Sequence, residues 1–128
     1  MQELIDRGAS AAGIDAALAE KSIGLILGFL KSEAPAAEMD QLLAAMPGAQ
    51  DTISKAQGGG GGSLLGSAMS ALGGGGIMGL AGQLTSAGLG MGEMQAVGKE
   101  LCAYGREKAG EDAVGAIAGS VPGLSQFI

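Results

Sequence analysis

Residues 56–92 read AQGGGGGSLLGSAMSALGGGGIMGLAGQLTSAGLGMG. These thirty-seven residues contain no charged side chain, and Lys55 and Glu93 bound them on either side. Small and apolar residues alternate through the stretch without the strict period of two that a half-buried strand shows. The stretch therefore separates two parts of the chain, and its own contacts must be apolar.

Two glycine runs, 58–62 and 73–76, divide this stretch. Between them Ser63–Leu72 is a short helical candidate with leucines on one side. Glycine loses more conformational freedom on folding than any other residue, so two such runs are typical of a connection and not of a helix interior. We expect residues 58–76 to be a glycine-rich apolar connector that carries a short helix.

Composition favours one all-α domain. The chain has 128 residues, enough to bury a core without disulfides or metals. Hydrophobic residues make up 47%, but there are only two phenylalanines, one tyrosine and no tryptophan. A core built from Leu, Ile, Val, Met and Ala is typical of closely packed helices, whereas strands are enriched in aromatic and β-branched residues.

Four helices are predicted before the glycine runs. Gly13 stands where a left-handed residue would end a first helix, and Asp15 is a plausible N-cap for a second over about 16–33. Pro35 suits the first turn of a third helix, and a short fourth covers 49–56 with one inward isoleucine. The third helix has a one-sided apolar stripe at i, i+3, i+4 and i+7: Met39, Leu42, Leu43 and Met46.

The predicted second helix is apolar all round at its centre. No polar residue lies between Ser22 and Lys31. A helix of this kind must be covered on every side, either by the rest of its own fold or by another molecule.

A shift of 75 residues superposes the two parts of the sequence without a gap. Gly13 falls on Gly88, and the Pro47–Gly48 pair falls on Pro122–Gly123. We therefore predict two helical repeats of about four helices each, at 1–57 and 77–128. Helices everywhere end at Pro and Gly, so shared punctuation is the alternative explanation. Apolar positions also agree: Ile14 with Leu89, Ile26 with Leu101, Phe29 with Tyr104, Met39 with Val114, Leu42 with Ile117, Met46 with Val121, and Ile53 with Ile128.

The long helix of the second repeat has a polar face that its counterpart lacks. Met94, Val97, Leu101 and Tyr104 share one side of it. We expect it to be a surface helix, whereas the first repeat's long helix is central or forms an interface. Its outward residues are Lys99, Glu100, Arg106, Glu107 and Lys108.

The composition argues against an enzyme, a cofactor or a metal site. The chain has no histidine and one cysteine, Cys102, at a core-type position. Histidine triads and Cys/His zinc sites are therefore excluded. The net charge is −6 and basic residues are scattered, so a nucleic-acid partner is not expected. The carboxylates of the second repeat, which have the pattern of solvated charges, are Glu93, Glu100, Glu107, Glu111 and Asp112.

Neither glycine run continues as the Lys-Ser or Lys-Thr of a phosphate-binding loop, which disfavours nucleotides. Small residues four apart, as at Gly24 and Gly28, would allow helices to approach closely in a bilayer, but the glycine runs interrupt any spanning segment. We expect a surface that packs against another copy or another protein; an ordinary core and a membrane-associated or lipid-binding protein are the alternatives. The residues predicted for this surface are Ile23, Ile26, Leu27, Leu30, Leu64, Leu65, Met69, Leu72, Ile77, Met78 and Met91.

Three features carry a family resemblance: GID at 13–15, LLAAMPGA at 42–49, and GED at 110–112 before a helix that ends in Gly-Leu. With the central glycines between them, the chain resembles the VcgC/VcgE-like family of small bacterial proteins of unknown function. The resemblance implies an all-α fold and no catalytic residues. Members often seem to be exported, but the N-terminus here lacks the basic and apolar regions of a signal peptide, so we expect a cytoplasmic protein.

Overall fold

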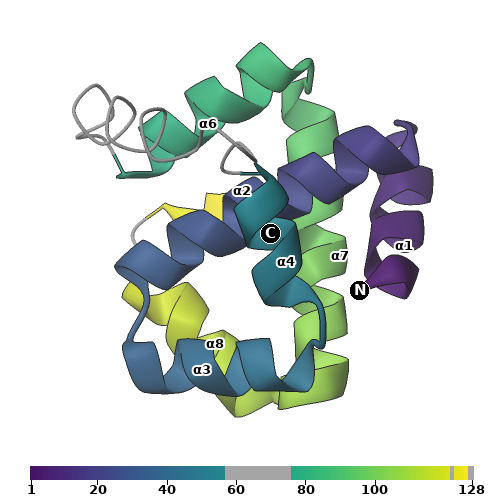
Figure 1. Cartoon of the computed structure of the whole chain (residues 1–128). Coiled ribbons are helices and arrows are strands. Elements are labelled where there is room, and N and C mark those ends of the chain that lie inside the picture. Colours follow the sequence, from purple (N-terminus) through teal and green to yellow (C-terminus); the bar gives the residue numbers. More distant parts are fainter. Residues whose placement is uncertain (57–75, 122, 127–128) are drawn as a thin grey trace.

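The computed structural model describes residues 1–56, 76–121 and 123–126. Over these ranges the chain is helical, with seven α-helices, one short 3₁₀ helix and no strand (Figure 1). The predicted all-α fold class is confirmed. The elements are α1 (Gln2–Ala12), α2 (Ala16–Glu33), α3 (Ala36–Ala45), α4 (Ala49–Ala56), α6 (Gly76–Ala87), α7 (Met91–Ala109), α8 (Glu111–Ser120) and η1 (Leu124–Gln126).

Local signals set the bounds of the first helices as predicted. Gly13 ends α1 in the left-handed conformation, with φ 70° and ψ 33°. The carboxylate of Asp15 accepts the backbone N–H of Leu18 at 3.0 Å and so caps α2. Pro35 is the residue before α3, one position earlier than the first helical turn in which the sequence placed it.

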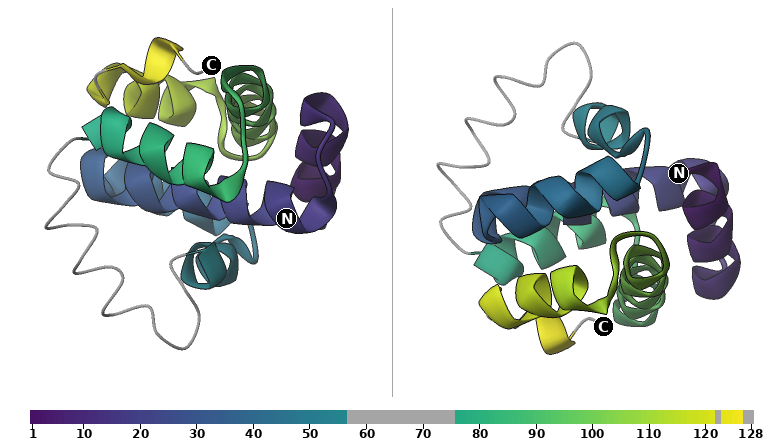
Figure 2. Two further views of the ribbon diagram at one scale, coloured as in Figure 1. Left: turned by 90° about the horizontal axis from the view of Figure 1, so that it is seen from above. Right: turned by 90° about the horizontal axis from the view of Figure 1, so that it is seen from below.

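Helix α2 lies at the centre of the molecule. It packs against α1, α3, α4, α6 and α7, and the views from above and below show α6 along one side and α4 on another (Figure 2). Its apolar run is covered by the chain's own helices and not by another molecule. All of the residues at 23–28 and Leu30 are buried.

A glycine allows α4 to lie directly against α2. A Cβ atom at Gly24 would clash with the carbonyl oxygen of Thr52 and the methyl group of Ala56, both on α4. Lys55 of α4 also donates to Glu20 of α2 at 2.9 Å. The absence of a side chain at residue 24 therefore determines how closely these helices pack.

Helix α7 is a surface helix, as predicted. Its inward residues Met94, Val97, Leu101 and Tyr104 are buried, and Lys99 is exposed. The same core takes side chains from every described helix, including Leu4 of α1, Met39 of α3, Ile53 of α4, Leu84 of α6 and Ile117 of α8.

Helix bounds in the two halves of the chain correspond at a shift of 75 residues. Adding 75 to the bounds of α2 and α3 gives 91–108 and 111–120, against the observed Met91–Ala109 and Glu111–Ser120. Helix α4 has only the three-residue η1 at its corresponding position. The glycines after equivalent helices have positive φ in both halves: 70° at Gly13 and 106° at Gly88, 91° at Gly48 and 82° at Gly123.

Several predictions fall outside the described residues. They concern the connector and its short helix at Ser63–Leu72, the Pro122 stop and the match of Ile53 with Ile128.

Candidate interaction surface

Helix α6 is fixed to the molecule by three leucines. Leu80 and Leu84 are buried, and α6 packs along α2. At its C-terminus Gly88 donates to the Thr85 carbonyl at 3.0 Å and Leu89 donates to the Leu84 carbonyl at 3.1 Å. This is the hydrogen-bond pattern of a Schellman cap, and Leu89 is buried beside the helix that it closes. The orientation of α6 is thereby determined.

The outward side of α6 and the turn after it form an uncharged exposed surface. Met78 is 75% exposed and Met91 is 62% exposed, and they are the large hydrophobic residues that the described chain exposes most. Between them the exposed residues are small or neutral. We call this the α6 surface: Met78, Gly82, Thr85, Ser86, Gly88, Gly90, Met91 and Gly92.

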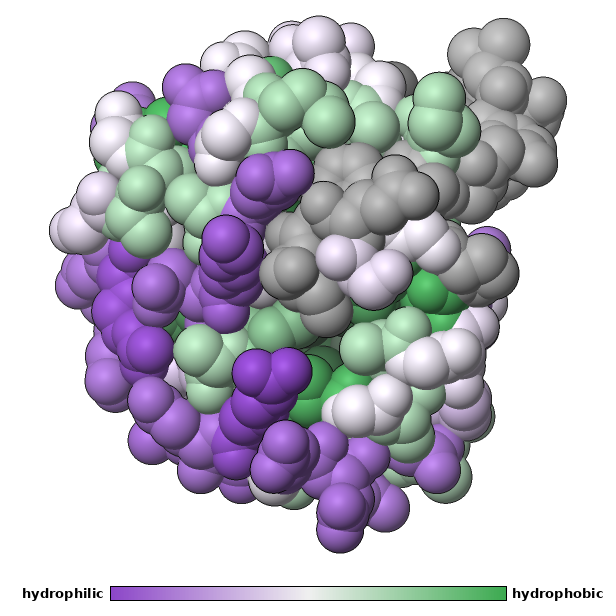
Figure 3. All heavy atoms as spheres, turned by 180° about the vertical axis from the view of Figure 1, so that it is seen from behind, coloured by the Kyte–Doolittle hydropathy of each residue, from purple (hydrophilic) through white to green (hydrophobic). Residues whose placement is uncertain are grey.

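Hydropathy differs across the molecule in the same sense. Seen from behind, pale green and white atoms dominate the upper part of the molecule, where Figure 1 places α6 (Figure 3). Hydrophilic atoms gather toward the lower left. Met78 and Met91 lie near opposite ends of a twelve-residue helix, which is about 18 Å long. An elongated partner such as a helix would match a surface of this shape.

The structure corrects part of the predicted surface. Ile23, Ile26, Leu27 and Leu30 are buried in the chain's own core, so they do not form an exposed interface. The sequence could not separate these possibilities, because an all-apolar helix needs a cover but does not identify it. Met78 and Met91 are exposed. Ile77 belongs to α6 but its side chain is not described, and four predicted residues lie outside the described ranges: Leu64, Leu65, Met69 and Leu72.

Glu93 holds the turn that presents Met91. Its carboxylate accepts the backbone N–H of Gly90, which is the N-cap residue of α7. The interpretation of Glu93 as a solvated charge is therefore wrong: it satisfies a helix-end donor. The spacing of three residues from Gly90 to Glu93 was a signal that could have shown this.

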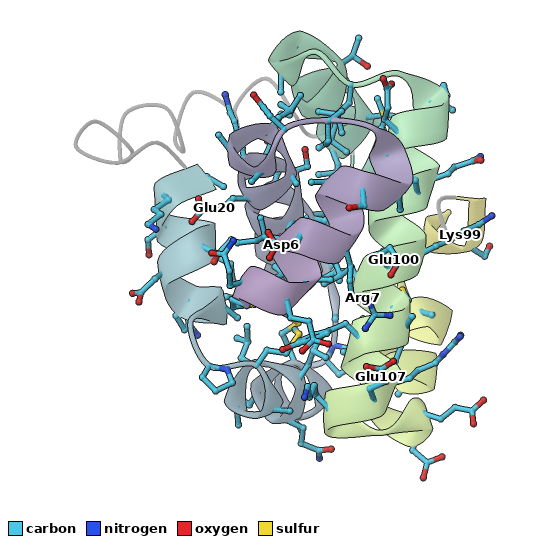
Figure 4. The ribbon with its side chains drawn as sticks, turned by 90° about the vertical axis from the view of Figure 1, so that its right-hand side faces the viewer. Asp6, Arg7, Glu20, Lys99, Glu100 and Glu107 are labelled. Carbon is cyan, nitrogen blue, oxygen red and sulfur yellow. The ribbon has the colours of Figure 1, made fainter. Side chains whose placement is uncertain are left out.

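A charged cluster joins α1 to α7. The Arg7 guanidinium donates from Nε to Glu100 at 3.0 Å and from Nη1 to Glu107 at 3.1 Å (Figure 4). The hydrogen bond to Glu107 raises the pKa of Arg7, with a smaller contribution from Glu100. Glu100 and Glu107 were interpreted as solvated charges; both are instead ion-paired across the two halves of the chain.

Cys102 lies half-buried on α7 and has no cysteine partner. Burial raises the pKa of its thiol, and the nearby Arg106 opposes this only in part. A raised pKa keeps the thiol protonated at neutral pH, where it is a poor nucleophile. The position therefore lacks the electropositive surroundings of a reactive cysteine.

Other kinds of site were sought over the described ranges. Residues 1–56, 76–121 and 123–126 hold no group of three or more Cys, Asp or Glu side chains placed to bind a metal ion. None of the helices described is both long and apolar enough to cross a membrane. Comparisons of the chain with protein-family models, curated proteins and solved structures found no match.

Proposed function

We propose that this chain is a non-enzymatic interaction or assembly protein that binds another copy or another protein through the α6 surface. The observation that carries the proposal is the exposure of Met78 and Met91, at 75% and 62%, on a surface without charge. Apolar side chains held in water favour association, because covering them removes apolar area from the solvent.

The chemistry of the surface supports a protein partner. Methionine has a flexible and polarisable side chain that adapts to the shape of an apolar partner. The glycine at residue 82 has no neighbouring heavy atom within 4 Å of the place where a Cβ would stand, so a partner's backbone can approach α6 there. Charged residues are depleted at the centres of protein interfaces, as they are here.

The experiment is light scattering behind a sizing column over a hundredfold range of concentration. We expect an apparent mass above the 12.3 kDa of one chain, rising with concentration. The double variant Met78→Glu/Met91→Glu should lower that mass, because it places two like charges on the surface. Both changes fall in the first turn of a helix, where a carboxylate favours the fold.

The matched control is Gln41→Glu, which adds a negative charge at an exposed position of α3. It should leave the apparent mass unchanged. A wild-type chain that stays at the mass of a monomer throughout, and binds no other protein in a pull-down, contradicts the proposal.

Phospholipid vesicles distinguish the alternative of a lipid-binding protein. An interaction protein stays in the supernatant when vesicles are sedimented. Co-sedimentation that the Met78→Glu/Met91→Glu variant abolishes and Gln41→Glu retains would replace the proposed function with lipid binding.

We also infer that the two halves of the chain are copies of one helical unit, joined by the glycine-rich connector. The corresponding bounds of α2 with α7 and of α3 with α8 support this. The equivalent glycines at 13 and 88 support it too, because a left-handed residue closes the first helix of each half. Gly13→Ala and Gly88→Ala should each cost about 1 to 2 kcal/mol of stability, measured by urea unfolding. A loss at only one of them would contradict their equivalence.

A further inference from the structure

We propose that the surface between the two halves of this chain also binds a second copy of it, so that residues 1–56 of one copy pair with residues 76–128 of another. The proposal deepens the proposed assembly function, since it identifies a partner and a second surface. It rests on which helices lie against one another and not on the α6 surface.

The first helix of each half packs on the long helix of the other half. Helix α1 lies along α7, and α6 lies along α2 (Figures 1 and 2). Helices α3 and α8 contact each other across the same boundary. Each half therefore completes the core of the other, which is the arrangement that exchange of identical elements between copies requires.

Close contacts at this boundary show that the halves are fitted to one another. A Cβ atom at Gly8 of α1 would lie 3.9 Å from Val97 Cγ2 of α7. A Cβ atom at Gly105 of α7 would lie only 3.1 Å from Leu42 Cδ1 of α3. A second copy supplies the same complementary shape, because its sequence is the same.

The polar contact across the boundary is equally specific. Arg7 belongs to the first half, and its two acceptors, Glu100 and Glu107, belong to the second. An exchanged dimer would contain this cluster twice, each time with the arginine of one copy and the carboxylates of the other.

Covalent geometry permits the exchange. The halves are joined by residues 57–75, and nineteen residues of extended chain span at most about 65 Å. A small domain is about 30 Å across, so a chain of this length can reach a second copy. The contacts between halves are the same in both species, and their proportions therefore depend on protein concentration against the effective concentration of the linked half, which is on the order of millimolar for a short flexible linker.

The test mixes two full-length variants with opposite charge changes. One copy carries Arg7→Glu, which places a carboxylate against Glu100 and Glu107. The other carries Glu100→Lys and Glu107→Lys, which places two ammonium groups against Arg7. Each variant alone has like charges at this cluster, whether its halves pair within one chain or between two identical chains.

A mixed dimer with exchanged halves has opposite charges at both clusters. After the two variants are unfolded and refolded together, native mass spectrometry should show a one-to-one heterodimer. Its fraction should be about tenfold the dimer fraction of either variant alone, a factor that corresponds to about 1.4 kcal/mol. A mixture with no more dimer than the average of its two components overturns the proposal.

Two controls separate the possible causes. The triple variant Arg7→Glu/Glu100→Lys/Glu107→Lys restores opposite charges within one chain, so it should have the dimer fraction of the wild type and a native circular dichroism spectrum. Adding Met78→Glu and Met91→Glu to both mixed variants should leave the heterodimer in place. Loss of the heterodimer on that addition would assign it to the α6 surface and overturn the exchange, whereas a persisting heterodimer supports exchange even if the α6 surface binds nothing.

Discussion

Helices α2 and α7 occupy equivalent positions in the two halves and have opposite surroundings. Helix α2 is covered by five other helices, whereas α7 presents exposed Lys99, Arg106 and Lys108. The difference is concentrated where α4 lies on α2. Gly24 permits that contact, and the equivalent residue of α7 is Lys99. A helix becomes central when a neighbour can approach it closely enough to exclude water, and a single position along it can decide this.

The largest expected effect is at the core position where the two helices differ. Leu27→Ala should cost about 2 to 5 kcal/mol of unfolding free energy, because Leu27 is fully buried and the substitution leaves a cavity. Its equivalent Cys102 is half-buried, and Cys102→Ala should cost less than about 1 kcal/mol. Urea unfolding at neutral pH measures both. Similar losses would mean that α2 and α7 are buried alike, against the comparison.

The next effect concerns the glycine under α4. Gly24→Ala should lower stability by about 1 to 3 kcal/mol, because α4 would have to move away from α2. Gly82→Ala on α6 is the matched control: it is also within a helix, but nothing lies near its missing Cβ. This control should raise stability by about 0.5 to 1 kcal/mol, since alanine favours the helix. Thermal unfolding of both variants would contradict the close contact if their midpoints shifted in the same direction.

A smaller effect is expected for the cluster that links α1 to α7. Arg7→Ala should cost less than about 1 kcal/mol, because the ion pairs are partly exposed to water. The loss should shrink at high salt, which screens exposed charges. Urea unfolding at low and high ionic strength gives the difference. A loss independent of salt would show that Arg7 acts through packing of its aliphatic stem and not through charge.

The smallest effect is on the chemistry of the thiol of α7. Since burial raises the pKa of Cys102, its thiolate fraction at neutral pH should be lower than that of a free cysteine. Alkylation by iodoacetamide should therefore be slow at neutral pH in the folded protein. It should accelerate as the pH rises through the raised pKa, and unfolding in urea should restore the ordinary rate. Fast labelling of the folded protein would contradict the burial of this position.

Much of the fold could be predicted from local signals. Asp15 and the Pro35 region bounded α2, and the spacing of Met94, Val97 and Leu101 identified the buried side of α7. These predictions succeeded because helix ends and helix faces depend on residues within a few turns of each other. The candidate surface was predicted only in part: Met78 and Met91 are exposed, whereas the α2 residues belong to the core.

The missed features depend on residues far apart in the chain. Arg7 pairs with carboxylates 93 and 100 residues away, and no short-range pattern relates them. Likewise, the contact of α4 with Gly24 depends on how the chain returns over α2. Charge patterns along one helix could only indicate that Glu100 and Glu107 share a polar face.

The sequence by itself determined that this chain is helical, where most of its helices begin and end, and which chemistries it lacks for want of histidine and clustered basic residues. Only the tertiary structure decided which apolar residues form the core and which remain exposed on the α6 surface. The physical reason is that helix formation is governed by neighbours along the chain, whereas burial depends on which helices meet in space.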